Sequence, residues 1–257
     1  MTALFFIDVL KKQPSFVHGT SPRCHVKNGV RKPLFCSDKG DEKLFFEDQI
    51  VFLHSLKIVT KVFFRVTQVH GNHVYVLKDS SIPVSEVGLC EADAIITHIP
   101  DCPIVVLTAD CVPIIIYDPI KHVVGIVHAG RLGTQKRIFT NTVEALSREY
   151  GSKPKNLIVG MGPAIRGCCY ELDEPCALPF IKKSPFSSEF INKIEGNKFF
   201  VDLPKVNRFE GYEAGILMKN IYTDGPCTSC ENDRWYSYRR EGKTGRLITL
   251  AMLQSRE

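Results

Sequence analysis

The residues of this sequence best suited to chemistry are two histidines and one cysteine, each close to a short apolar run. His70 lies in a Gln-Val-His-Gly segment, Cys111 follows Ala-Asp, and His128 begins a His-Ala-Gly segment. Two imidazoles and one thiolate form a three-ligand set for zinc that leaves a fourth position for water or substrate. Their wide spacing matches no local metal motif, so a packed cysteine and two histidines hydrogen-bonded to the backbone remain an alternative interpretation.

The elements that must position these residues are buried strands. Short apolar runs bounded by Asp, Pro or Gly are typical of strands buried on both faces. Four such runs occur, at residues 94–97, 104–108, 113–117 and 123–127. A histidine or cysteine on the turn after such a strand points into a crevice, where ligand and catalytic groups tend to lie. We therefore expect His70, Cys111 and His128 at the ends of buried strands.

The rest of the chain shows both helical and strand patterns. Apolar spacing predicts helices over residues 45–57, 134–150 and 207–220, with Gly151 as the C-cap of the second. Further strands are predicted at residues 59–66, 74–77, 157–161, 235–239 and 247–253, the first two paired across a Gly-Asn turn. Residues 14–43 indicate loops and short strands. The sequence predicts an α/β fold, with residues 1–257 forming a single mixed-sheet domain flanked by helices.

Composition excludes several classes of protein. The chain has 257 residues, 44% of them hydrophobic and 24% charged, which argues against disorder, collagen and coiled coils. The net charge of +5 is mild and unclustered, so we expect no nucleic-acid partner. The chain has no apolar stretch of the roughly 18 residues that a membrane span needs. Its start reaches Asp8 before a signal sequence can form, so we expect a cytoplasmic protein without a membrane partner.

The chain contains ten cysteines. In a reducing cytosol they would be thiols or metal ligands rather than disulfides. Cys227 and Cys230 have CxxC spacing, but a structural zinc site would need a second such pair, and only Cys168-Cys169 comes near. We therefore expect buried thiols rather than copper ligands at four positions. These are Cys102, Cys168, Cys169 and Cys176.

A series of short motifs occurs in the order found in one protein family. They lie at residues 68–71, 92–97, 108–113, 128–130, 162–165, 169–171, 227–228 and 237–246. Each motif alone is weak, but the ordered series is specific. From about His18 to Leu250 the chain resembles the YfiH-like laccase-domain proteins. That family was first described as multicopper polyphenol oxidases and later as purine nucleoside phosphorylases with adenosine deaminase activity.

The resemblance implies the laccase-domain fold and a set of functional residues. The family's zinc ligands fall on His70, Cys111 and His128, with copper a less favoured ion. The arginine of its N-terminal Phe-Ser-Thr-Arg segment corresponds to Arg23. An arginine fork suits phosphate, so Arg23 is the first candidate for binding the anion, with a surface arginine as the alternative.

Two segments depart from the family pattern. The usual His-Ala-Gly-Trp-Arg-Gly is His-Ala-Gly-Arg-Leu-Gly here (residues 128–133), so the aromatic residue is lost and the arginine is displaced by one position. Arg131 would supply the charge from another angle, although a one-residue shift in a strand or turn reverses direction. An asparagine usual in the N-terminal region is absent, and Cys36 or Ser37 takes its place.

The resemblance implies two reactions in one pocket. For deamination, zinc lowers the pKa of its water, which attacks C6 of adenosine. Asp110, Glu171 and Asp93 are the candidate acids, each alternatively a helix cap or a partner that fixes a histidine tautomer. For phosphorolysis, phosphate attacks C1′ of the ribose in a cationic or N–H-rich cradle. Arg23, Arg131 and the amides around Gly130 and Gly133 are candidates for this cradle.

The implied substrates are adenosine and inosine, with guanosine and methylthioadenosine as further candidates, in a monomer or homodimer. One alternative is a copper polyphenol oxidase. That chemistry needs many ligands, mostly histidine, for a mononuclear and a trinuclear centre, whereas the chain has eight histidines in all. Another alternative is peptidoglycan editing in cell-wall synthesis, without purine turnover.

Overall fold

Strands and helices are interspersed along the chain in the computed structural model, which describes residues 3–27, 29–35, 42–60, 63–183, 185–194 and 196–256. The helices are α1 (Asp8–Lys11), α2 (Glu42–Ser55), α3 (Val84–Gly88), α4 (Arg131–Gln135), α5 (Ile138–Tyr150), α6 (Glu174–Lys183), α7 (Leu203–Glu213) and α8 (Tyr238–Glu241). The strands are β1 (Phe16–Thr20), β2 (Cys24–Lys27), β3 (Val30–Pro33), β4 (Val74–Leu77), β5 (Ala94–Thr97), β6 (Ile104–Thr108), β7 (Val112–Asp118), β8 (Val123–Ala129), β9 (Ile158–Met161), β10 (Glu171–Asp173), β11 (Ile191–Lys193), β12 (Lys198–Val201), β13 (Ile221–Tyr222) and β14 (Leu247–Leu253).

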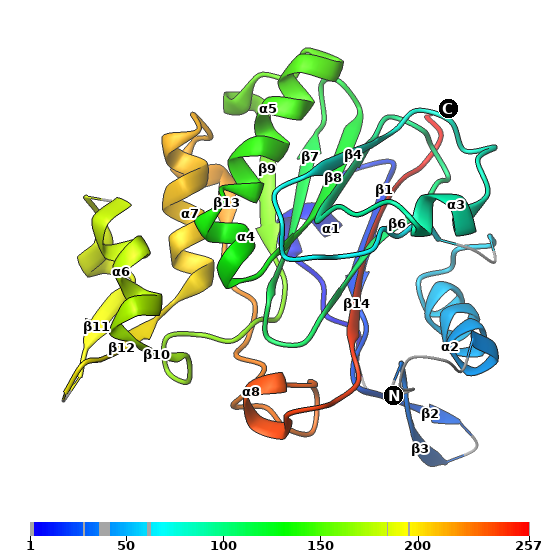
Figure 1. The fold of residues 1–257 in the computed structure, drawn as a ribbon. Coiled ribbons are helices and arrows are strands. Elements are labelled where there is room, and N and C mark those ends of the chain that lie inside the picture. Colours follow the sequence, from blue (N-terminus) through cyan, green and yellow to red (C-terminus); the bar gives the residue numbers. More distant parts are fainter. Residues whose placement is uncertain are drawn as a thin grey trace.

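Two stacked sheets form the centre of the molecule (Figure 1). The larger has six strands in the order β13-β9-β7-β8-β5-β4. It is mixed, because β4 and β13 run parallel to their neighbours while the other pairs are antiparallel. The smaller sheet, in the order β1-β14-β6, is antiparallel throughout. A third sheet, β10-β12-β11, lies at the periphery beside α6.

Period-two alternation in the strands explains the stacking. Along β7, Ile114 and Ile116 pack into the core shared with α5 and α7, while Ile115 and Tyr117 pack into the core shared with the smaller sheet. The outer face of the smaller sheet is covered by α2. The layers are therefore helices, six-stranded sheet, three-stranded sheet and helix. Burying each such isoleucine stabilises the fold by about 1.5–3 kcal/mol.

Most of the predicted architecture is confirmed. The α/β class is correct, with the difference that two main sheets replace one central sheet. The strands expected at residues 94–97, 104–108 and 247–253 have the bounds of β5, β6 and β14. Gly151 caps α5 with a φ of 67°, and its N–H bonds the Ser147 carbonyl.

Two predicted strands were wrong, and one predicted helix is shifted toward the N-terminus. Residues 59–66 form no strand in their described part, where Phe64 makes only an isolated bridge, and β4 pairs with β5 instead. Residues 235–239 form no strand, because Trp235 is buried in a small core and Ser237 caps the short helix α8. The late helix begins earlier, at Leu203, because Asp202 provides its cap.

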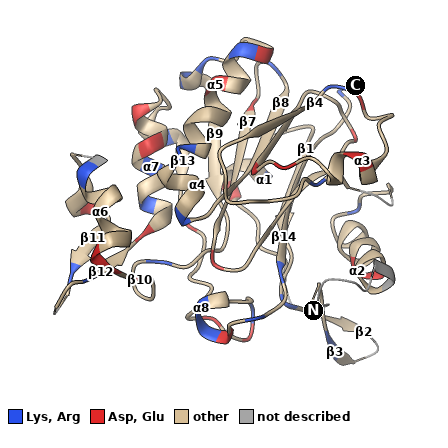
Figure 2. Cartoon of the chain, in the orientation of Figure 1, with Lys and Arg blue, Asp and Glu red and all other residues tan. Residues whose placement is uncertain are grey.

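Three further features complete the outline of the fold. Within the described ranges, no helix is long and apolar enough to cross a membrane. Figure 2 shows basic and acidic residues interspersed on α5, α7 and α8, in keeping with the small net charge. Cys36 and Ser37, which take the place of the expected asparagine, lie outside the described residues.

Candidate metal centre

The topology of the six-stranded sheet brings His70, Cys111 and His128 to one of its ends. Strand β8 runs antiparallel to β7, so His128, near the end of β8, pairs with Pro113, near the start of β7. Cys111 lies in the turn immediately before β7, and His70 lies in the loop before β4. The expectation that each histidine follows a strand was therefore wrong. His128 lies within β8, near its end, and His70 precedes β4, because β4 and β5 run parallel to each other and β8 runs antiparallel to β5.

The three side chains have the geometry of a single metal site. Their ligand atoms all lie within 4.8 Å of one another. Cys111 Sγ is 3.9 Å from His70 Nε2, and the two imidazole rings meet edge to face with centroids 4.7 Å apart. Tetrahedral zinc, with bonds of about 2.3 Å to sulfur and about 2.0 Å to nitrogen, places such atoms about 3.6 Å apart. The donor set therefore fits zinc and leaves a fourth position open.

Gly130 keeps the space between two of these ligands open. A Cβ atom at this position would lie 2.9 Å from Cys111 Sγ and 2.9 Å from His70 Cδ2. Both distances are too short for carbon contacts, so any larger residue would push the ligands apart. The glycine of the His-Ala-Gly motif is thus required by the close approach of the two side chains.

Asp93 connects the two histidines of the site. Its carboxylate accepts hydrogen bonds from Nδ1 of His128 at 2.8 Å and from the amides of His70 at 3.0 Å and Gly71 at 2.6 Å. Because Nδ1 of His128 donates to Asp93, Nε2 is available to a metal. Burial alone would raise the pKa of Asp93, but His128 and the amides hold that pKa below its usual value.

The ligands also change one another's protonation. Burial alone would raise the pKa of Cys111, but His128 and His70 lower it to about 6. Burial would lower the pKa of His128, whereas the Cys111 thiolate and the Asp93 carboxylate raise it to about 9. At neutral pH this environment favours the thiolate of Cys111, which is the form that binds metal ions.

The loop that carries His70 is fixed from both sides. The side chain of Gln68 donates to the Leu107 carbonyl and accepts from the Leu107 amide, both at 2.8 Å, so the loop is attached to β6. His70 itself has a φ of 56°, in the left-handed region that few residues other than glycine adopt. The hydrogen bond from its backbone amide to the Asp93 carboxylate holds this conformation. The Gln-Val-His-Gly motif thus consists of a residue that anchors the loop and, two positions later, a candidate ligand.

Asp110 connects the turn before Cys111 to the C-terminal part of the chain. One carboxylate oxygen accepts from the Thr228 hydroxyl and the other from the Arg239 amide, each at 2.6 Å. Asp110 is buried and has a φ of 82°. These contacts give it a clear role in holding Cys111 in place.

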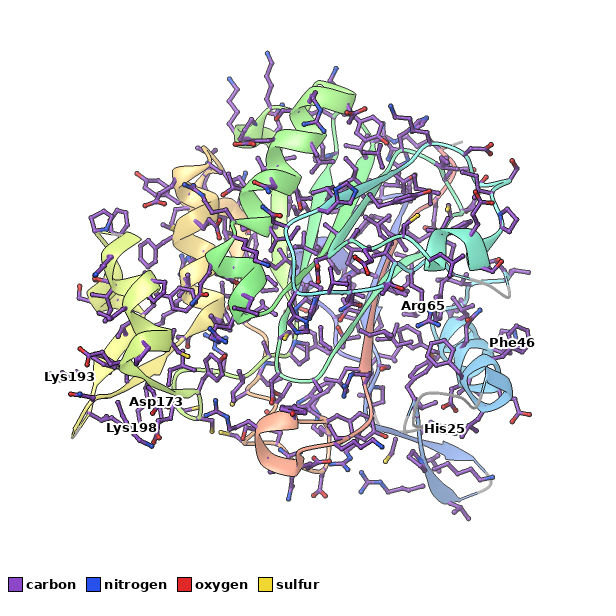
Figure 3. The ribbon with its side chains drawn as sticks, in the orientation of Figure 1. His25, Phe46, Arg65, Asp173, Lys193 and Lys198 are labelled. Atoms are coloured by element: carbon purple, nitrogen blue, oxygen red, sulfur yellow. The ribbon has the colours of Figure 1, made fainter. Side chains whose placement is uncertain are left out.

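Arg23 and Glu171 each engage an opposite charge. The Arg23 guanidinium donates to both carboxylate oxygens of Glu241, at 3.0 and 3.4 Å, and lies over the Tyr236 ring. Glu171, on β10, pairs with Lys198 on β12. Figure 3 labels Lys198 at the edge of the molecule, on the peripheral sheet. The fold therefore groups Asp93 and Asp110 with the metal ligands, whereas the carboxylate of Glu171 faces Lys198.

The electrostatics around Cys111 add Tyr170 and Arg239 to the site; Arg239 lies in the motif at residues 237–246, whereas Tyr170 was not singled out from the sequence. Burial raises the pKa of Tyr170 to about 12, with a further contribution from the Cys111 thiolate, while Arg131 and Arg239 oppose the shift. The Arg239 guanidinium stacks on the Tyr170 ring at 4.9 Å. Arg131 is the first residue of α4, so the expected strand-like reversal of its direction does not apply. In the sequence, the position of an aromatic residue directly after Cys168-Cys169 is the pattern that indicates Tyr170.

Two hollows in the described part of the surface lie away from this site. One of about 430 Å³ includes Val143, Arg148 and Ala214, and another of about 180 Å³ includes Phe180 and Phe190. Both lie among the helices on the outer face of the six-stranded sheet, and neither lining contains a metal-ligand triad residue. The chemistry of the side chains therefore identifies the site better than cavity size does.

Several relatives resemble this chain in sequence. A purine nucleoside phosphorylase of Deinococcus radiodurans is 35% identical over 234 residues, or 90% of this chain and 87% of that protein. Purine nucleoside phosphorylase YlmD of Bacillus subtilis is 34% identical over 164 residues, or 63% of this chain and 59% of that protein. Purine nucleoside phosphorylase LACC1 of Mus musculus is 29% identical over 238 residues, or 89% of this chain and 53% of that protein. The chain thus spans less than two thirds of the Bacillus and mouse relatives.

Two crystal structures share the fold. YfiH of Bacillus licheniformis, described as a hypothetical protein, superposes with a TM-score of 0.87 at 24% identity, over 99% of this chain and 97% of that one. YlmD of Geobacillus stearothermophilus superposes with a TM-score of 0.83 at 24% identity, over 94% of this chain and 93% of that one. In addition, residues 38–254 match the family model described as multi-copper polyphenol oxidoreductase laccase. The chain therefore belongs to the multi-copper polyphenol oxidoreductase laccase family.

Proposed function

We propose that this protein is a zinc-dependent purine nucleoside phosphorylase that also deaminates adenosine. The observation that carries the proposal is the convergence of His70, Cys111 and His128 at one sheet end, with Asp93 orienting two of them. The names of the sequence relatives support the phosphorylase part. The substrates would be adenosine and inosine, with guanosine and methylthioadenosine as further candidates, and the protein would act in the cytoplasm as a monomer or homodimer.

Zinc suits the donor set better than copper does. Thiolate and imidazole in a tetrahedral arrangement are typical zinc ligands, and a three-ligand site with an open position is typical of catalytic zinc. Zinc bound there would supply Lewis acidity and a lowered pKa for a coordinated water. The thiolate of Cys111, favoured by its neighbours, offsets part of the ion's charge.

Tyr170, Arg131 and Arg239 would form the substrate side of the site. The Tyr170 ring offers a stacking surface, and the two guanidinium groups offer donor forks suited to phosphate. In phosphorolysis a phosphate oxygen bonds to C1′ as the bond from C1′ to the purine nitrogen breaks, and the departing base takes up a proton. Arg23 remains a candidate for the anion, and its fork would then exchange the Glu241 carboxylate for phosphate.

Proton transfer is assigned to carboxylates of this region. Asp110 is the first candidate, because it lies next to Cys111 and is held by the Thr228 hydroxyl and the Arg239 amide. Glu171 is the second candidate, with its main-chain carbonyl held by Arg239. In deamination, water oxygen replaces the 6-amino group of adenosine, which leaves as ammonia after a proton moves to it.

A copper polyphenol oxidase is the competing function, favoured by the description of the family model. Among the described residues, two groups of side chains could hold a metal ion, and only the triad contains histidine. A trinuclear copper centre needs many more imidazoles than the two that converge here. The geometry therefore favours the mononuclear site.

The test is incubation with adenosine or inosine, with and without inorganic phosphate, followed by separation of the products. We expect inosine to give hypoxanthine and ribose 1-phosphate only when phosphate is present, and adenosine to give inosine without it. Oxidation of a phenolic dye, with nucleosides unchanged, would favour the oxidase instead.

A further inference from the structure

A second group of metal-ligand side chains lies outside the triad. Cys168 and Cys169 are in the turn between β9 and β10, and Cys227 and Cys230 are in the segment between β13 and α8 (Figure 1). Backbone hydrogen bonds join the two segments: the Ala164 amide donates to the Pro226 carbonyl, and the Thr228 amide donates to the Ala164 carbonyl. Residues about 60 positions apart in the sequence are thereby placed side by side.

The four sulfur atoms converge on one point. Cys230 Sγ is 3.4 Å from Cys169 Sγ and 3.6 Å from Cys168 Sγ, and all four sulfurs lie within 4.8 Å of one another. A disulfide bond would need about 2.05 Å. Four thiolates around one zinc ion, at about 2.3 Å each, lie about 3.8 Å apart. An iron–sulfur cluster instead spreads its cysteines around several metal ions.

We propose that Cys168, Cys169, Cys227 and Cys230 bind one structural zinc ion. Four protein ligands fill a tetrahedral shell and leave no position for substrate, which is the arrangement of structural zinc sites. The adjacent Cys168-Cys169 pair does not have the usual CxxC spacing, which is why the sequence analysis did not favour this site. The expectation of buried thiols was wrong for Cys168, which is exposed, as is Cys230. The site is therefore open to an incoming ion.

The surroundings of the cluster support a bound cation with anionic ligands. Backbone N–H groups of Arg166, Ser229 and Cys230 hydrogen-bond Cys227, as amides do for metal-bound sulfur. The Arg240 guanidinium donates to the Thr228 and Ser229 carbonyls, at 2.8 and 2.9 Å, and so fixes the turn inside the CxxC segment. Arg166 holds the residues just before that segment through the Thr223 and Gly225 carbonyls, at 2.7 and 2.9 Å.

The site would support the triad indirectly. Thr228, inside the CxxC segment, donates to Asp110, next to the ligand Cys111. Tyr170 directly follows Cys169, and it stacks with Arg239. An ion bound by the four cysteines would therefore join the two segments that carry Tyr170 and Thr228. The proposal does not depend on which reaction the triad performs.

The test measures zinc bound per chain by mass spectrometry of the metal, after equilibration with zinc and removal of unbound ion. We expect two zinc ions in the wild-type protein, one in Cys227→Ser/Cys230→Ser, and one in Cys111→Ala, which removes a triad ligand. Cys90→Ser, in a partly exposed cysteine outside both groups, is the matched control and should keep two. Zinc content in Cys227→Ser/Cys230→Ser equal to that of the wild type would overturn the proposal.

A second measurement covers the case in which the double variant does not fold. Cobalt(II) added to Cys111→Ala, which keeps all four cluster cysteines, should give the intense thiolate-to-cobalt absorption of a tetrahedral four-sulfur site. Zinc should also protect these cysteines of the wild-type protein from alkylation. Absence of that absorption, or a cluster cross-linked by disulfides under reducing purification, would refute the zinc site.

Discussion

The triad and the four-cysteine cluster are built on different parts of the fold. The candidate ligands of the triad lie at the end of a six-stranded sheet whose register is fixed over several strands, and the buried Asp93 carboxylate contacts both histidines. The cluster ligands come from two turns that are joined by a few backbone hydrogen bonds. The first arrangement holds three ligands precisely and leaves one position open, as catalysis requires. The second supplies four ligands and suits an ion that fastens turns together.

The triad and the four-cysteine cluster also differ in how deeply they are buried. His128 and Asp93 are buried, so the triad is insulated from solvent on its inner side. Cys168 and Cys230 are exposed, so the cluster lies at the surface. Chemistry needs fixed donors in a site of low dielectric, whereas a structural ion needs only a complete shell. Four predictions test this contrast.

The largest effect is expected for Cys111→Ala. Two imidazoles hold zinc poorly, so both proposed activities should fall together by more than ~100-fold. Loss of a residue that only hydrogen-bonds a metal ligand already lowers metal affinity or activity by about 10–100-fold. Between the metal-free proteins the unfolding free energy should differ by only about 1 kcal/mol, because the substitution leaves a small cavity. Activity, zinc content and thermal unfolding are measured on the same preparation. Full activity with the triad zinc still bound would contradict the triad.

Asp93→Asn should produce the next largest effect. The amide keeps the size of the side chain but removes the charge that orients His128, so zinc affinity of the triad should fall by about 10–100-fold. Asp118→Asn is the matched control. Asp118 is also a buried carboxylate that accepts backbone amides, from Ile120 and Lys121, but it lies at the opposite end of β7. Zinc affinity is measured by competition with a chelator. Equal losses of zinc affinity in both variants would indicate a general loss of stability.

Arg23→Ala separates phosphate binding from deamination. Loss of a charge-assisted contact costs about 1.5–3 kcal/mol, so phosphorolysis should weaken by roughly tenfold or more while deamination changes little. Glu241→Gln removes the partner charge but keeps the arginine, and should leave phosphate use intact. Matching losses of both activities in the two variants would show that the pair is structural. Steady-state kinetics with varied phosphate provide the measurement.

The smallest effect concerns thiol reactivity in metal-free protein. The pKa of Cys111 is lowered to about 6, so its thiolate is present above that pH and is lost below it. Hydrogen bonding with Cys169 raises the pKa of Cys230 to about 11, so this thiol stays protonated at pH 7.5. A thiolate of low pKa is also less nucleophilic, which leaves an expected rate advantage of about tenfold for Cys111. Alkylation followed by peptide mass spectrometry measures both rates, and faster labelling of Cys230 would reverse the contrast.

Local sequence patterns were sufficient for the strongly apolar strands. Runs such as residues 104–108 and 247–253 bury both faces, and the first of them consists mostly of β-branched residues, which favour strands. The same patterns failed at residues 59–66 and 235–239. There, tertiary contacts decide the backbone: Phe64 makes a single bridge to β6, and Trp235 is buried beside the Ser237 cap.

The sequence by itself determined which residues are the candidate triad ligands, because residue types in an ordered series of motifs carry that information. Only the tertiary structure decided how they meet, since the antiparallel register of β7 and β8 and the parallel register of β4 and β5 place the ligands at one end of the sheet. It also decided the grouping of Cys168 and Cys169 with the CxxC pair. The adjacency of two turns depends on backbone hydrogen bonds between distant segments, and no local spacing encodes such bonds.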